Sequence, residues 1–135
     1  MNVKATCLTA LAVAASSAVL VADPASAGTV NRYASCSTST ASVTVAFTID
    51  KAAGRYGTLV AAHGSAEGEF TDDPAMTVRV RDGYGRLIVA KTSTDGSLSL
   101  TFARRIGGPN WTAEATLKNT ASGPCTTHRR KIAVI

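Results

Sequence analysis

Apolar and polar residues alternate with a period of two along most of the chain after residue 40. The alternation is clearest in four segments, SVTVAFTID, MTVRVRD, SLSLTFAR and WTAEATLKN. Residues two apart on a strand face the same way, so each segment has one apolar and one polar face. From residue 28 onward, no segment repeats apolar residues at helical spacing. The pattern therefore predicts antiparallel strands with one face toward a core.

The apolar faces of these segments also predict which side chains are buried. The residues expected to point inward are Val43, Val45, Phe47, Ile49, Met76, Val78, Val80, Leu98, Leu100, Phe102, Trp111, Ala113, Ala115 and Leu117. Among the residues between them, Arg79, Arg81 and Glu114 are expected to point to solvent.

Turn-forming residues separate the alternating segments at short, regular intervals. Residues 82–85 are expected to form a tight hairpin, because the pair Asp82-Gly83 tolerates the positive φ that such turns need. A flexible N-terminus up to about Arg32 is also expected. The pattern gives seven to eight short strands, at about 29–36, 41–50, 57–66, 76–82, 86–93, 97–104, 111–119 and 125–134.

Short antiparallel strands at this spacing predict an all-β fold, a Greek-key β-sandwich of two sheets. In this pattern of strands and turns, the chain resembles the immunoglobulin-like class of bacterial extracellular modules. The resemblance rests on the alternation alone and assigns no functional residue.

The N-terminus has the features of a secretory signal peptide. Residues 5–22 carry no charge and follow Lys4, and Ala25 and Ala27 flank Ser26 just before Gly28. A membrane anchor is the alternative, but the run is rich in Ala, Ser and Thr rather than Leu and Ile. We therefore expect a signal-peptide helix over 1–27 that is cleaved, a single domain over 28–135 with no membrane span, and secretion from a bacterial cell.

Two cysteines remain after removal of the signal peptide, Cys36 and Cys125. An even pair in an exported chain predicts a disulfide. The alternative is a pair of free or metal-bound thiols, but a metal would need more ligands than these two. The bridge would close a loop of about 90 residues between the start and the end of the domain.

The C-terminal segment CTTHRRKIAVI carries four consecutive residues with nitrogen-bearing side chains, within a chain of net charge +5. On a regular strand Arg129 and Lys131 would lie on one face and Arg130 on the other, unless a bulge intervenes. One interpretation is that the charges keep an edge strand from pairing with other chains. The other is a basic surface for an anionic partner, whose candidate polyanion-binding residues are Arg79, Arg81, Arg129 and Lys131, with Arg104 and Arg105 nearby.

Catalytic and metal chemistry have weaker signals. His63 and Ser65 lie two apart, but they lack the strand-to-helix elbow of a serine hydrolase. The acidic residues between 67 and 73 fit neither an EF-hand loop nor an evident pair of glycosidase carboxylates. Tyr84 and Trp111 could offer rings to a sugar, although the alternation favours burial of Trp111. We expect no catalytic residues, no cofactor and no metal site.

Together these features predict a small secreted non-enzymatic protein that binds an anionic extracellular or cell-envelope polymer. Specific nucleic-acid binding is not expected, because no aromatic residues are interleaved with the basic ones. The main alternative is a protein-binding effector, such as a protease inhibitor that presents Arg104-Arg105, or a toxin-like protein. A small hydrolase is the third hypothesis.

Overall fold

The computed structural model describes residues 28–134, which contain nine β-strands. The expected signal helix over 1–27 lies outside these residues, as does Ile135. The strands are β1 (Thr29–Ser37), β2 (Ala41–Asp50), β3 (Thr58–Gly68), β4 (Phe70–Arg81), β5 (Leu87–Ser93), β6 (Ser97–Arg105), β7 (Thr112–Thr120), β8 (Cys125–Thr126) and β9 (Arg130–Lys131).

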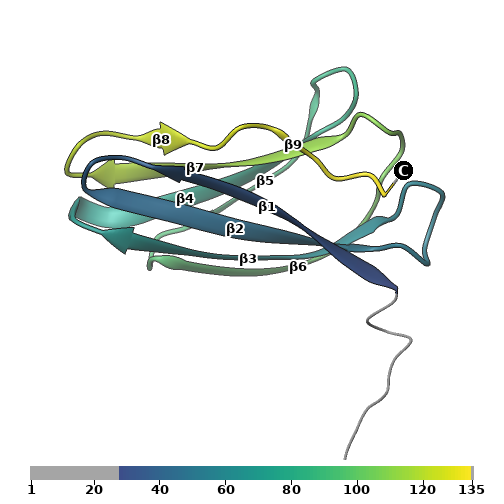
Figure 1. Ribbon diagram of the computed structural model, residues 1–135, viewed down its shortest axis with the longest axis horizontal. Helices are drawn as coiled ribbons and strands as arrows, with labels where there is room; N and C mark the ends of the chain where they lie inside the picture. Colours follow the sequence, from purple (N-terminus) through teal and green to yellow (C-terminus); the bar gives the residue numbers. More distant parts are fainter. Residues whose placement is uncertain (1–27, 135) are drawn as a thin grey trace, which may run out of the picture.

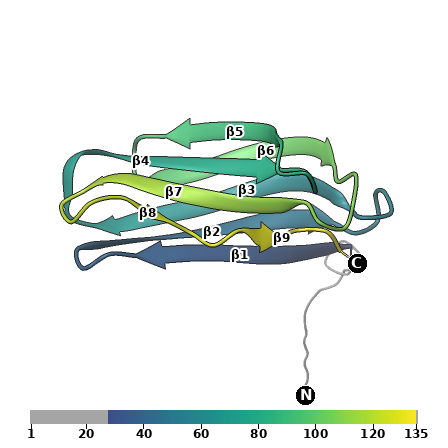
Figure 2. The same ribbon diagram turned by 90° about the horizontal axis from the view of Figure 1, so that it is seen from above.

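The strands form two antiparallel sheets that lie face to face (Figures 1 and 2). One sheet has the order β1-β2-β3-β6, and the other has the order β5-β4-β7-β8, with β9 also paired to β7. At one edge of the molecule, β8 and β9 run close to β1 (Figure 2). The all-β prediction and its two layers are confirmed. β1 begins at Thr29, close to the predicted strand, so the expected flexibility up to about Arg32 is wrong for residues 29–32.

The core lies between the two sheets and follows the predicted alternation. The inward residues of β2 and β4 are fully buried, as are Ala115 and Leu117 of β7. Leu100, Phe102 and Trp111 pack against this cluster but are only partly buried. Glu114 does point to the outer face of β7, but its expected exposure to solvent needs a correction, because this residue is only 9% exposed. Arginine side chains cover it on the outer face of the sheet.

The predicted hairpin between β4 and β5 is present, but its left-handed residue is a different glycine from the one expected. Gly85 has φ +82°, whereas Gly83 does not have a positive φ. Gly85 N–H donates to the Asp82 carbonyl, and the register shifts between Val80 and Arg81. A turn that ends in a left-handed residue next to a bulge is one of the common hairpin connections.

The predicted C-terminal strand over 125–134 is broken into β8 and β9 by a bulge. Thr126 pairs with Thr116 and Arg130 pairs with Ala113, so the C-terminal segment has one residue more than β7 across this interval. At the bulge, the Thr127 hydroxyl accepts a hydrogen bond from the backbone N–H of Ala115 at 2.9 Å, in place of a backbone carbonyl. The extra residue changes which face each side chain takes. Cys125 and Ile132 can therefore both point inward, although they are an odd number of residues apart.

Within residues 28–134, no helix is long and apolar enough to cross a membrane.

Candidate functional site: a basic groove and an aromatic pocket

The edge where β1 meets the C-terminal segment is joined by one covalent and one polar contact. The predicted Cys36–Cys125 disulfide is present and links β1 to β8, with a Cα–Cα distance of 6.2 Å. Nearer the C-terminus, the Arg32 guanidinium donates from Nη2 to the Ala133 carbonyl at 3.1 Å. These two contacts hold β1 against the end of the other sheet and fix the distance between the walls of a surface groove.

This basic groove has a volume of ≈ 430 Å³ and is lined by Arg32, Arg129, Arg130, Lys131 and Ala133. Four of its five lining residues are cationic, and none is acidic. A second hollow of ≈ 230 Å³ shares Arg129 and Arg130 with it and adds His128 and the exposed Tyr33. The two hollows together form a continuous cationic surface along this edge of the molecule.

Both faces of β9 contribute to the groove because β9 lies at a sheet edge. Lys131 pairs with Thr112 and takes the outer face, whereas Arg130 pairs with the buried Ala113 and extends from the inner side of the sheet. Arg32 also lies on the inner side of β1, since it alternates with the exposed Tyr33. Arg130 and Lys131 thus lie on opposite faces of β9, as the alternation predicts. Both side chains nevertheless line the same groove.

The predicted polyanion-binding residues lie together on the outer face of the five-stranded sheet, but three of them have protein partners. Arg81 Nε lies 3.1 Å from Glu114 Oε1, and Arg129 Nε lies 3.7 Å from the same oxygen. Arg79 donates from Nη1 to Thr116 Oγ1 at 3.0 Å. Glu114 therefore offsets part of the positive charge on this face. Of the four residues, Arg129 and Lys131 also line the basic groove.

Arg32 and Arg130 were missed as candidate site residues. The sequence carries no local signal for Arg32, because its approach to the C-terminal segment depends on the packing of two sheets. For Arg130, strand alternation predicts the face opposite to Arg129 and Lys131. That argument holds for the middle of a sheet but not for an edge strand, whose two faces meet at the open side.

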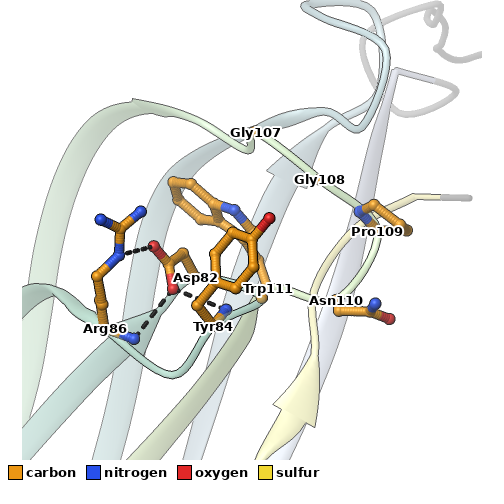
Figure 3. A pocket seen from close by; sticks show the side chains of 9 residues that line it. Asp82, Tyr84, Arg86, Gly107, Gly108, Pro109, Asn110 and Trp111 are labelled. Carbon is orange, nitrogen blue, oxygen red and sulfur yellow. Dashed lines mark hydrogen bonds and ion pairs between the residues drawn. The ribbon is translucent and has the colours of Figure 1, made fainter.

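A third hollow of ≈ 500 Å³, the aromatic pocket, lies between the β4–β5 hairpin and the loop before β7 (Figure 3). Its walls come from Asp82, Gly83, Tyr84 and Arg86 on one loop and from residues 107–111 on the other. Tyr84 is 89% exposed, whereas Trp111 is partly buried against the core. The loop before β7 packs closely on the indole, because a Cβ at Gly107 would lie 3.3 Å from Trp111 Cζ2.

Asp82 organises the hairpin that carries Tyr84. Its Oδ1 accepts hydrogen bonds from Tyr84 N–H at 2.9 Å and Arg86 N–H at 3.0 Å, and its Oδ2 accepts from Arg86 Nε at 2.9 Å. The Arg86 guanidinium also lies 5.7 Å from the centre of the Tyr84 ring. Burial raises the pKa of the Asp82 carboxyl, but the hydrogen bonds from Arg86 and Tyr84 outweigh it and hold this pKa below its ordinary value.

Replacing Asp82 with Asn is expected to destabilise the protein at neutral pH but not at strongly acidic pH. A carboxyl whose pKa is lower in the folded state stabilises the fold above about pH 4, and this contribution is lost as the pH falls through the folded-state pKa. Thermal melts of parent and Asp82→Asn from pH 7 to pH 2 should therefore converge at the acid end. A constant difference in melting temperature would show that the carboxylate charge is not what matters.

The remaining sequence candidates lie on exposed parts of the strands. His63 Nδ1 is 3.3 Å from Ser99 Oγ on the neighbouring β6. Arg104 and Arg105 form the end of β6 and pair with Leu59 and Thr58 of β3. Within residues 28–134, no three His, Cys, Asp or Glu side chains gather as they would around a metal ion.

Comparisons with protein-family models, with curated proteins and with solved structures gave no match to this chain.

Proposed function

We propose that this protein is a secreted, non-enzymatic binding module that holds an anionic extracellular or cell-envelope polymer in the basic groove. The observation that carries the proposal is the lining of the groove, where four cationic side chains converge and no acidic residue does. Carboxylate, phosphate and sulfate groups are the natural partners of clustered guanidinium groups, which bind them through paired N–H donors.

A polymer fits this surface better than a small anion. The cationic residues Arg129, Arg130 and Lys131 follow an edge, and the adjoining hollow adds the side chains of His128 and Tyr33. Repeated charges on a chain could contact several of these residues in turn, and counterion release would then make the binding depend steeply on salt.

Secretion is supported by the disulfide, since such bonds persist in oxidising compartments, and by the charge pattern of residues 1–27. An immunoglobulin-like Greek-key sandwich is the finer fold that we propose. The chain passes between the sheets after β3, β5 and β6, so that β3 pairs with β6 and β4 pairs with β7. Strands paired at such separations are typical of Greek-key connections.

The test removes two groove charges and compares the result with an equal change elsewhere. Arg130→Gln/Lys131→Gln takes two cations from the groove, and the matched control, Arg104→Gln/Arg105→Gln, takes two from exposed positions on β6. On a heparin column with rising NaCl, the groove variant should elute at lower salt than the control. In binding assays, log K for binding is plotted against log salt concentration. Each cationic side chain that contacts the polymer should steepen this slope by at most about 0.9.

Equal elution of the two variants would contradict a localised site and leave only the attraction of the net charge. Both variants change exposed side chains, so the free energy of unfolding should move by no more than about 0.5 kcal/mol. If the groove variant instead keeps its heparin retention and forms dimers, the basic residues protect an edge strand from pairing, and the proposed function is wrong.

The inhibitor alternative gains no support from the position of Arg104 and Arg105. A protease-binding loop must present its arginine to a deep pocket, whereas both residues lie in paired positions of β6.

A further inference from the structure

We propose that the aromatic pocket binds one sugar ring of the polymer that the basic groove holds, so that the ligand is an anionic polysaccharide. This inference rests on the proposed function and narrows the class of polymer. A chain such as polyphosphate would satisfy the groove but has no ring to place against Tyr84 and Trp111. The two sites together would recognise the sugar backbone as well as its charge.

The pocket has the size and lining of a small-ligand site. Its ≈ 500 Å³ falls within the range of about 300 to 1,000 Å³ that such sites occupy. It offers two aromatic rings, with the Arg86 guanidinium 5.7 Å from the centre of the Tyr84 ring, and Asn110 also lines it (Figure 3). A pyranose ring has apolar C–H faces that pack on the negative face of an aromatic ring, and hydroxyls that need such polar partners.

Tyr84 is held in place although its side chain is almost fully exposed. The Asp82 carboxylate fixes the backbone on both sides of it through Tyr84 N–H and Arg86 N–H. Arg86, itself paired with Asp82 at 2.9 Å, lies against the tyrosine ring. A large exposed ring on an ordered turn loses little conformational freedom when a ligand packs on it, which favours binding.

The aromatic pocket and the basic groove share no lining residue, but the backbone at the start of β7 connects them. Trp111 of the pocket directly precedes Thr112, which pairs with Lys131 of the groove, and the Trp111 carbonyl accepts a hydrogen bond from Ile132 N–H at 3.2 Å. On the other side, Arg81 donates to the Gly85 carbonyl of the hairpin at 3.2 Å. A polymer with one sugar in the pocket would thus extend past the start of β7, and a carboxylate further along it could reach Lys131.

Trp111 is the only tryptophan in the sequence, so its fluorescence reports directly on the pocket. The test titrates the protein with an alginate hexasaccharide, which is a chain of uronates, and with sodium polyphosphate of matched charge. Alginate should change the Trp111 emission and polyphosphate should not, while both should bind in a salt-dependent way. Tyr84→Ala should weaken alginate binding about two- to tenfold and leave polyphosphate binding unchanged, and Tyr84→Phe, which keeps the ring, should behave like the parent.

Each other outcome identifies which proposal fails. If alginate leaves the emission unchanged, or if Tyr84→Ala binds it as the parent does, the sugar pocket is wrong, and the groove is still judged by Arg130→Gln/Lys131→Gln. If alginate changes the emission but that groove variant binds both polymers like the parent, the proposed function is wrong while the pocket stands. Equal affinity for a neutral cellohexaose would overturn the anionic character of the sugar ligand.

Discussion

Replacing both Cys36 and Cys125 with alanine is expected to lower the free energy of unfolding by about 4 kcal/mol. The bridge joins residues 89 apart in the sequence, so its loss frees a long loop in the unfolded chain. β8 contributes only two residues to its ladder with β7, which leaves the end of this sheet dependent on the covalent link. Urea unfolding of the double variant, followed by circular dichroism, gives the difference.

Reduction of the parent protein provides the control. A reducing agent should lower the melting temperature of the parent to that of the double alanine variant, and it should not affect the variant itself. The disulfide also holds one wall of the basic groove against the other, since Arg32 lies on β1 and Arg130 on β9. Heparin retention should therefore fall together with stability, and a reduced parent that melts at an unchanged temperature would refute the structural role.

The strands could be predicted from sequence because most of them bury one face only. β2 and the second half of β4 bury alternate residues, and here the expected boundaries agree closely with the structure. Prediction failed where a local irregularity interrupts the alternation. β4 begins at Phe70, whereas the sequence predicted a strand only from residue 76. The register shifts between Phe70 and Ala75, so the residues between the two expected strands are accommodated within β4.

The basic groove could be predicted only in part, because it depends on contacts between distant segments. Local pattern identified the basic run at 129–131, but Arg32 reaches it through the packing of one sheet edge against the other. The aromatic pocket is similar, since Tyr84 and Trp111 come from loops that the β4–β7 pairing brings together. The bulge between β8 and β9 could have been predicted from the sequence. Cys125 and Ile132 are both suited to the core but are seven residues apart, and a regular strand would place them on opposite faces.

Ile132 is the residue through which the bulge affects stability, and Ile132→Ala is expected to cost about 2 to 5 kcal/mol. Its side chain is 0% exposed, so truncation removes buried methyl groups and leaves a cavity between the sheets. Ile132→Val is the matched control and should cost only about 0.5 to 1.5 kcal/mol, because it removes a single methylene. Urea unfolding of both variants measures the two costs on the same scale.

The same pair of variants tests whether the inward position of Ile132 orders the basic groove. Ile132 follows Lys131 directly, and its N–H donates to the carbonyl of Trp111 just before β7, so looser packing here should also disturb the groove. Ile132→Ala should elute earlier from heparin than Ile132→Val, although neither change alters the charge. An Ile132→Ala variant as stable as Ile132→Val would place this side chain outside the core. The register produced by the bulge, and with it the arrangement of Arg130 and Lys131, would then be wrong.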